Sequence, residues 1–308
     1  MKVLITGGAG FIGHNVAIHL KNLGYRVIAF DSLKRSTILA KDRLMENGIA
    51  LLKGDIMVAK DLDVALKSVD VVVHAAAYIS VEESIRRPVI YFRNNVAGTA
   101  SLAEACLRNG VNELIYLSSA AVYGDPKSLP IGEEHPTSPI SPYGLSKLMG
   151  EEVLKFYAKN GLKYTILRIF NAYGVGQSPS YAGVITRFIE SALKGRSLVI
   201  YGDGQQTRDF VHVQDVAEAI RLSIESSTKN EIFNIGSGKP TKIYELAKTI
   251  IDLLNRDISI RHAMPRAGDI RQSYADISKA QSILGFCPSF SLKQGLINLL
   301  ENLPKKRP

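Results

Sequence analysis

The chain has 308 residues, enough for one large domain or two of modest size, and its 46% hydrophobic and 22% charged residues are an ordinary globular balance. No segment has the roughly 20 consecutive apolar residues that a membrane span needs, so we expect no membrane partner. The formal net charge is +9, but the basic residues are spread along the sequence and the tight run is at 305–307. We therefore expect a solvated basic surface and no nucleic-acid site.

Cysteine and histidine content bears on compartment and on metal binding. The two cysteines, Cys106 and Cys287, lie far apart in sequence and are interpreted as reduced thiols of a cytoplasmic protein. The six histidines form no ligand cluster, so no metal site is predicted. The chain enters a strand within two residues, so we expect no signal peptide.

The first predicted elements are a strand at 2–6 and a helix at 11–23, joined by closely spaced glycines. Their spacing satisfies both Gly8-x-Gly10-x-x-Gly13 and Gly7-x-x-Gly10-x-x-Gly13. Glycines let the backbone turn sharply and let a pyrophosphate approach, and the phosphates then meet the free N–H groups of the helix N-terminus. The alternative is a structural turn in some other α/β protein.

Asp31 ends the second predicted strand, at 25–30, and lies eighteen residues after Gly13. A carboxylate there can accept both hydroxyls of an adenosine ribose and would repel a 2′-phosphate. NAD is therefore favoured over NADP. Lys34 and Arg35 follow closely and weaken this preference, because a flexible base could bind a 2′-phosphate.

Strand-like and helical patterns alternate through the first ~170 residues, which indicates a parallel, doubly wound sheet of the Rossmann type in an α/β protein. The predicted strands are 2–6, 25–30, 49–53, 69–74, 112–117 and 164–168, and the predicted helices are near 11–23, 61–67, 89–109 and 142–160. Several polar or small residues follow strand ends and should line one crevice: Asp31, Asp55, the 74–77 segment, Ser118 and Ser119.

Beyond about residue 172 the sequence becomes loop-like, and strand and helix patterns then return at 210–220. No linker divides the chain. We predict a smaller C-terminal substrate domain that is interleaved with the first: 1–171 with about 207–236 form the dinucleotide-binding domain, and about 172–206 with 237–308 form the second.

The segment from Ser141 to Lys147 has the features of a helix start that carries acid–base chemistry. Ser141 is a plausible N-cap, Pro142 suits the first helical position, and Tyr143 and Lys147 share one helix face. A phenol is a poor base at pH 7, and an ammonium beside it favours the phenolate and lowers its pKa. Tyr143 could then remove a hydroxyl proton as hydride leaves the adjacent carbon. The alternative is an amphipathic helix with a surface lysine.

Ser119 ends a predicted strand and could hydrogen-bond the reacting oxygen in the same crevice. The alternative role is a strand-end cap. No nucleophile elbow surrounds Ser119, so it is not interpreted as a nucleophile.

With these motifs the chain resembles, nearly end to end, the extended short-chain dehydrogenase/reductases, and among them the UDP-galactose (UDP-glucose) 4-epimerase family, including its UDP-N-acetylglucosamine branch. The resemblance rests on the glycine turn at 6–13, Gly54-Asp55-Ile56, His74-Ala75-Ala76-Ala77, Asn94-Asn95-Val96-x-Gly98-Thr99, Ser118-Ser119-Ala120-Ala121-Val122-Tyr123-Gly124, Tyr143-x-x-x-Lys147, Phe170-Asn171, Tyr201-Gly202-Asp203-Gly204-x-Gln206-Thr207-Arg208-Asp209 and Pro265-Arg266-Ala267-Gly268-Asp269-x-Arg271. It implies bound NAD, a UDP-sugar substrate, and a homodimer formed by the helices near 89–109 and 142–160.

The resemblance also implies roles for individual residues. Tyr143 would be the base, Lys147 would hold the nicotinamide ribose and tune Tyr143, and Ser119 would assist proton transfer. The residues around NAD would be Gly7, Gly10, Phe11, Ile12, Gly13, Asp31, Ser32, Asp55, Ile56, Ala75, Ala76, Asn95, Tyr143, Lys147 and Phe170. The UDP-sugar would contact Ser119, Asn171, Val184, Tyr201, Arg208, Arg266, Asp269 and Ser273.

Several alternatives remain within this resemblance. Ser119 is followed by Ala120, where related dehydratases carry an acid, so dehydration lacks its acid–base pair, although a dehydratase, an oxidoreductase and a UDP-glucuronate 4-epimerase remain the runners-up. The small Ser273 leaves room for an acetamido group, so UDP-GlcNAc and UDP-GalNAc join UDP-glucose and UDP-galactose as expected substrates. Two positions depart from the family pattern: Ile79 replaces a lysine of some members, and 32–35 lacks the usual glycine. A third hypothesis is a non-catalytic scaffold.

Overall fold

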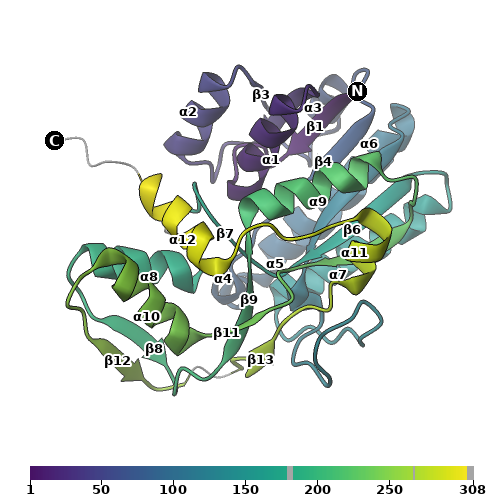
Figure 1. Ribbon diagram of the computed structural model, residues 1–308. Coiled ribbons are helices and arrows are strands. Elements are labelled where there is room, and N and C mark those ends of the chain that lie inside the picture. Colours follow the sequence, from purple (N-terminus) through teal and green to yellow (C-terminus); the bar gives the residue numbers. More distant parts are fainter. Residues whose placement is uncertain (179–182, 266–267, 304–308) are drawn as a thin grey trace.

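A computed structural model describes residues 1–178, 183–265 and 268–303. Its main sheet is built from β1 (Lys2–Thr6), β2 (Arg26–Asp31), β3 (Ala50–Lys53), β4 (Val71–His74), β5 (Glu113–Ser119), β6 (Lys163–Ile169) and β10 (Glu231–Ile235). Within the described residues these seven strands are parallel, in the order β10-β6-β5-β4-β1-β2-β3 (Figure 1). In chain order, β2 and β3 are added on one side of β1, and β4, β5, β6 and β10 are then added on the other side. This reversal confirms the predicted doubly wound α/β fold and places a ligand crevice at the carboxyl ends of β1 and β4.

Helices cover both faces of this sheet because successive strand residues point to opposite sides. Val3 and Ile5 join a core with α1 (Phe11–Asn22), α2 (Ile38–Glu46), α9 (Val213–Glu225) and α11 (Ser278–Leu284). Leu4 faces the other side and joins a core with α3 (Ala59–Ala65), α6 (Gly98–Arg108) and α7 (Pro142–Ala158). The strands are therefore apolar on both faces, as buried parallel strands are.

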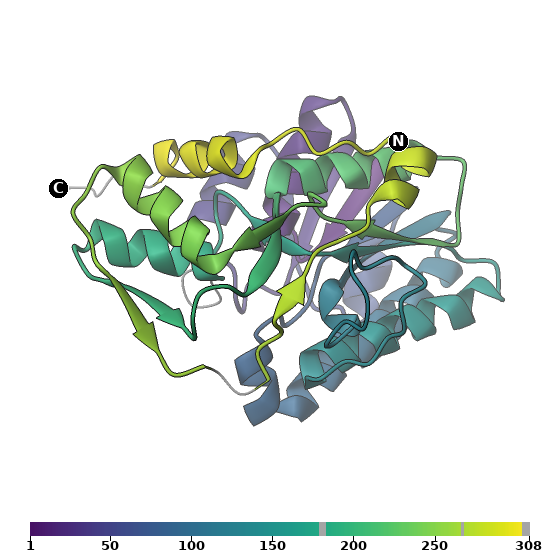
Figure 2. The same cartoon turned by 60° about the horizontal axis from the view of Figure 1, so that its bottom comes forward.

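A second, smaller part of the molecule lies beside the carboxyl ends of these strands (Figures 1 and 2). Its strands are β7 (Asn171–Tyr173), β8 (Leu198–Tyr201), β9 (Thr207–His212), β11 (Pro240–Lys242), β12 (Ile260–Ala263) and β13 (Gln272–Ser273), and its helices are α8 (Val184–Leu193), α10 (Ile243–Leu254) and α12 (Leu292–Glu301). In the described ranges, β9 pairs with β7, β11 and β13, while β8 pairs with β12. Phe188, Ile200, Leu246 and Leu296 share its core.

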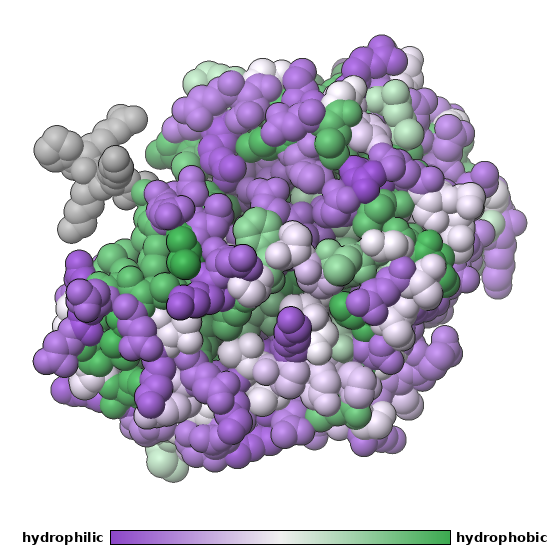
Figure 3. All heavy atoms as spheres, in the orientation of Figure 1, coloured by the Kyte–Doolittle hydropathy of each residue, from purple (hydrophilic) through white to green (hydrophobic). Residues whose placement is uncertain are grey.

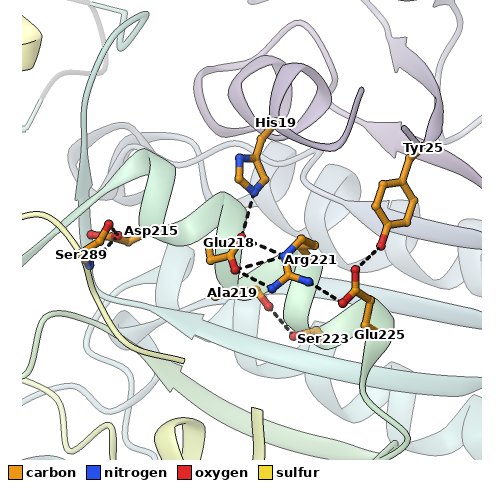
Figure 4. Close-up of polar contacts among 9 residues, drawn as sticks. All are labelled: His19, Tyr25, Asp215, Glu218, Ala219, Arg221, Ser223, Glu225 and Ser289. Atoms are coloured by element: carbon orange, nitrogen blue, oxygen red, sulfur yellow. Dashed lines mark hydrogen bonds and ion pairs between the residues drawn. The ribbon is translucent and has the colours of Figure 1, made fainter. Parts of the chain in front are cut away.

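The chain returns from this second part to the main sheet through α9 and β10. Polar contacts fasten α9 to the N-terminal helix: His19 Nε2 lies 3.0 Å from Glu218, and the Tyr25 hydroxyl donates to Glu225 over 2.6 Å (Figure 4). Asp215, also on α9, accepts from the Ser289 amide and hydroxyl, which ties down the segment that leads to α12.

The helices differ in detail from those predicted. The predicted 89–109 helix consists of α5 (Pro88–Tyr91), a wider π-helical segment η1 (Phe92–Ala97) and α6, and it is preceded by α4 (Val81–Arg86). A further one-turn helix, η2 (Ala120–Val122), follows β5. The predicted domain division stays a prediction. Strand β10 belongs to the main sheet and α9 packs on it, but β9 lies in the second part and α11 packs on β10.

Among the helices of the described residues, none is long and apolar enough to cross a membrane.

Candidate active site

The glycine turn closes β1 and presents the start of α1. Gly7 has a φ of +67°, and its carbonyl accepts the Gly10 amide over 2.9 Å. A Cβ on Gly7 would lie 2.7 Å from the backbone of Ala75 and Ala76, and one on Gly13 would lie 2.1 Å from the Gly7 carbonyl. The first turn of α1 carries no acidic residue, and Gly10 offers no side chain to cap it. The turn therefore leaves backbone N–H groups for an anion, as a dinucleotide diphosphate requires.

Asp31 lies beside this turn at the end of β2. Its Oδ2 accepts the Ala9 amide over 3.0 Å and its Oδ1 accepts the Leu33 amide over 2.7 Å. Burial raises the pKa of Asp31, and the two amides oppose this effect. The carboxylate is thus held in place by backbone donors while it lines the cavity that extends from the glycine turn.

The outer cavity holds the predicted adenosine-side residues. It is lined by Gly7, Gly10, Asp31, Ser32, Asp55, Ile56, Ala75 and Ala76. Lys34 donates to Asp55 over 2.8 Å. Burial raises the pKa of Asp55, but the Lys34 hydrogen bond and the Met57 amide outweigh it, so the pKa is lowered overall.

The inner cavity brings the predicted catalytic residues to the same glycine turn. It is lined by Gly7, Gly10, Phe11, Ile12, Gly13, Ala75, Ser119, Tyr143, Lys147 and Phe170. Ser141 caps α7 by accepting the Gly144 amide over 3.1 Å, and Pro142 occupies the first turn, as predicted. This cap sets the start of the helix and so aims Tyr143 and Lys147 into the cavity.

Burial dominates the titration of the tyrosine and the lysine. Burial raises the pKa of Tyr143, and the smaller effect of a hydrogen bond with Ser119 lowers it. Burial lowers the pKa of Lys147 to about 7, against the nearby charge of Glu151. The Lys147 ammonium donates to the Leu117 carbonyl over 2.7 Å. The structure thus differs from the expectation that Lys147 lowers the Tyr143 pKa: among the protein's own groups, burial sets the direction of the shift.

A buried ion pair supports this side of the site. Glu151, one helical turn after Lys147, accepts from Arg168 on β6 over 2.7 Å and from the Ser118 hydroxyl over 2.5 Å. Arg168 also donates to the Tyr123 hydroxyl over 3.0 Å. The side chains of Glu151 and Arg168 are 0% and 4% exposed, so this network locks α7 to β5 and β6.

Strand β7 separates the inner cavity from a third one. Phe170 and Ala172 line the inner cavity, whereas Asn171 lines the third, as the two-residue period of an extended chain requires. The third cavity is also lined by Val184, Tyr201, Arg208 and Asp269, all predicted to bind substrate. Figure 3 shows the surface hollowed near the middle of this view, with apolar residues deep in the hollow.

Arg208 is a cation of the third cavity whose guanidinium is held in place by several partners. It donates to the carbonyls of Thr207 and Ile270 over 2.8 and 2.7 Å and pairs with Asp269. Burial lowers its pKa, against the Asp269 charge. Ser273 is buried on β13 directly opposite Arg208. Arg266 lies outside the described residues.

Three predicted positions, Ser273, Asn95 and His74, do not line these cavities. Asn95 is 1% exposed. Its Oδ1 accepts the Tyr78 backbone amide and its Nδ2 donates to the Tyr78 carbonyl, each over 2.9 Å. Its neighbour Asn94 lines the outer cavity instead. His74 was expected in the crevice, but it lies within the sheet, where Thr6 and Thr99 bond its ring nitrogens over 2.7 and 2.9 Å.

Sequence reasoning missed several residues at the site. Arg187 and Ser191 line the third cavity three and seven residues after Val184, so the helical period from Val184 was an available signal. Gln206 lines the same cavity and donates to the Tyr201 carbonyl, while its Oε1 has no partner among the described atoms. Tyr78 lies in a loop and carried no periodic signal.

The profile of the NAD dependent epimerase/dehydratase family matches residues 3–236. A Methanocaldococcus jannaschii protein, provisionally named a UDP-glucose 4-epimerase, is 42% identical over 97% of this chain and 98% of its own length. The structure of Thermotoga maritima UDP-glucose 4-epimerase with UDP-glucose is 37% identical, with a TM-score of 0.92 and 98% of both chains covered. UDP-N-acetylglucosamine 4-epimerase from Methanobrevibacter ruminantium, in complex with UDP-N-acetylmuramic acid, is 36% identical, with a TM-score of 0.90 over 98% of this chain and 99% of that one.

Proposed function

Because the chain belongs to the NAD dependent epimerase/dehydratase family, we propose that it is an NAD-dependent UDP-sugar 4-epimerase. One observation carries this proposal: Ser119, Tyr143 and Lys147 line the same cavity as the glycine turn. An acid–base group thus lies next to the place where a dinucleotide fits. A scaffold without activity would not need this arrangement.

The glycine turn and Asp31 fit NAD. The turn is packed too tightly for a Cβ at Gly7 or Gly13 and presents the N-terminus of α1 to the diphosphate, and Asp31 offers a fixed carboxylate for the adenosine ribose. Lys34 is paired with Asp55, which supports NAD over NADP. Bound NAD would take a hydride from C4 of the sugar and return it to the opposite face.

The residues of α7 and β5 would handle the proton. Tyr143 removes the proton from the C4 hydroxyl and later returns it, and Ser119 bonds the same oxygen. A positive charge is needed to offset the burial that raises the pKa of Tyr143. We assign that task to Lys147 in its charged form together with the positive nicotinamide. Asn95 would act indirectly, by fixing the Tyr78 backbone.

The third cavity would hold the UDP group. Arg208 is held by two carbonyls and can offer its guanidinium to the diphosphate, which bidentate donors match well. Asn171, Val184, Tyr201 and Asp269 line the remaining walls, with Tyr201 assigned to the uracil. Since β7 alone separates the two cavities, the sugar would pass from the diphosphate toward Tyr143. Arg266 stays a sequence-based proposal for the diphosphate.

We assign UDP-glucose/UDP-galactose and UDP-GlcNAc/UDP-GalNAc as the substrate pairs. The small, buried Ser273 beside Arg208 supports acceptance of the acetamido group. The testing experiment is an epimer-resolved NMR assay of the purified protein, without added NAD, on UDP-galactose and UDP-GalNAc. Conversion to the C4 epimers supports the proposal. A 4-keto product or released NADH would favour the dehydratase or oxidoreductase, and conversion of UDP-glucuronate alone would favour the uronate epimerase.

We also propose a cytoplasmic homodimer. An apolar groove on α6 and α7 is lined by Leu145, Leu148, Met149, Val153 and Phe156, and the Phe156 side chain is largely exposed. In a dimer with a two-fold axis, the groove of one copy would pack against the same groove of the other copy, so both would be covered. Replacing Met149 by Glu should halve the mass measured by sedimentation. An unchanged mass would contradict this interface, and Lys155→Gln, on the same helix but outside the lining of the groove, serves as the control.

A further inference from the structure

Arg35 lies where the outer and inner cavities meet. It lines both of them, together with Gly7 and Gly10 of the phosphate-binding turn. The sequence flanking it, 32–35, departs from the usual family pattern, and the proposed function has given it no task beyond cofactor choice. Its position corresponds to the middle of a bound dinucleotide, between the adenosine and nicotinamide halves.

The Arg35 guanidinium is fixed from the opposite wall of the cleft. Its two terminal nitrogens donate to the two carboxylate oxygens of Glu83 over 2.7 and 2.8 Å. It also stacks 3.8 Å above the centre of the Tyr78 ring. Glu83 in turn accepts from the Tyr91 hydroxyl over 3.0 Å, and its own amide donates to the Ser80 cap of α4. Glu83 and Tyr78 thus hold the planar cation directly, while Tyr91 and Ser80 hold Glu83.

This arrangement joins two separate segments across the cleft. Arg35 comes from the connection between β2 and α2, whereas Tyr78 and Glu83 come from the connection between β4 and α4 and from α4 itself. The side chains of Arg35 and Glu83 are 24% and 18% exposed, so water screens this pair less than a surface pair. The described residues that line both cavities are Gly7, Gly10, Arg35, Ala75 and Ala77, so Arg35 is the charged one among them.

We propose that Arg35 bridges the middle of the cofactor cleft, placing a cation beside the NAD diphosphate and closing the two walls over it through Glu83 and Tyr78. The inference rests on the proposed function, because it assumes that NAD lies in this cleft. Retention suits an epimerase, since each turnover regenerates NAD and needs no exchange. An arginine is required because its planar fork stacks on the ring and pairs with both carboxylate oxygens at once.

The test is the rate at which the purified protein releases its own NAD, measured by exchange against excess 1,N6-etheno-NAD. Arg35→Ala should release NAD about 10- to 100-fold faster, the range expected for loss of a charged hydrogen-bonding partner. Arg35→Lys keeps the charge without the fork, so its rate should be intermediate. Glu83→Gln should speed release several-fold because it loosens the bridge without removing the cation.

Arg86→Ala is the matched control, since this arginine forms an exposed pair with Glu82 on α4. Its release rate should equal that of the unmodified protein. If Arg35→Ala fails to fold, the Arg35→Lys and Glu83→Gln rates decide the question. Unchanged release in the folded Arg35 variants, with NAD bound one to one, overturns the bridge and leaves the epimerase proposal standing. An unmodified protein that binds no NAD and forms no epimer overturns both.

Discussion

Single residues at this site behave as their burial dictates. Tyr143 and Lys147 were placed together correctly from a four-residue spacing, because helical geometry fixes their common face. Their protonation could not be derived in the same way. The direction of each pKa shift depends on how much water the fold removes, and the sequence does not contain that quantity.

Tyr143→Phe should lower kcat by about 100- to 10,000-fold, the usual contribution of a positioned acid–base group. The ring keeps its packing, so NAD should remain bound. Turnover measured by NMR, with bound NAD measured after denaturation, checks both parts. Near-normal turnover would contradict the assignment of the base.

Ser273→Tyr should abolish turnover of UDP-GalNAc and spare that of UDP-galactose. Ser273 pairs with Arg208 between β13 and β9, and if the acetamido group lies there the larger side chain would occupy its place. The measurement is kcat/KM for the two sugars in parallel, with Ser273→Ala as the volume-matched control. Equal loss of both activities would show that Ser273 does not select the substrate.

At the scale of elements, the alternating pattern predicted six of the seven main-sheet strands that the structure describes, but it did not predict β10. The predicted strands end within two residues of the observed ends, because each is a short apolar run bounded by polar residues. The helix near 89–109 was predicted as one piece. Its π-helical segment at 92–97 could not be predicted from periodicity, because Asn95 is held there by tertiary bonds to Tyr78 and Ser146.

Glu151→Gln should destabilise the protein by about 3–5 kcal/mol, because it leaves the buried Arg168 charge without its partner. Urea unfolding is the measurement. Asp63→Asn removes an exposed partner of Arg108 and should change stability little. Similar midpoints for the two variants would mean that water reaches the Glu151 network.

At the scale of the whole molecule, two buried histidines make the fold sensitive to acid. Burial lowers the pKa of His14 to about 4 and that of His74 to about 3, below the usual 6.5. Between pH 6.5 and the folded-state pKa of each histidine, the unfolded chain binds more protons than the folded protein. The free energy of unfolding therefore falls as the pH drops below 6.5. At pH 5 the loss is about 2 kcal/mol for each histidine.

The measurement is the unfolding free energy from urea titrations at pH 7.5, 6.5 and 5. His74→Gln removes one of the two groups, so the decline between pH 6.5 and 5 should be about half as steep. An identical slope in that variant would assign the acid sensitivity to other groups.

The division of the chain into interleaved parts could be predicted only in outline. The strand and helix patterns that return at 210–220 indicated that the first part resumes there, but β9 belongs to the second part and β10 to the main sheet. Both have the same apolar pattern. Each strand pairs with the sheet that has an unpaired edge next to it in the fold. A single sequence does not show which sheet has such an edge.

The position of α9 and β10 has a consequence for synthesis on the ribosome. Helix α1 packs against α9, and β10 pairs with the edge of β6. This face of α1 and the edge of β6 are therefore covered only after residues 213–235 have been synthesised. Val16, Ala17 and Leu20 therefore stay uncovered on that side while about 200 further residues emerge. The sheet is completed only after the chain has traversed part of the second lobe, so a nascent chain stalled near residue 200 presents an apolar helix face and an unpaired strand edge to chaperones.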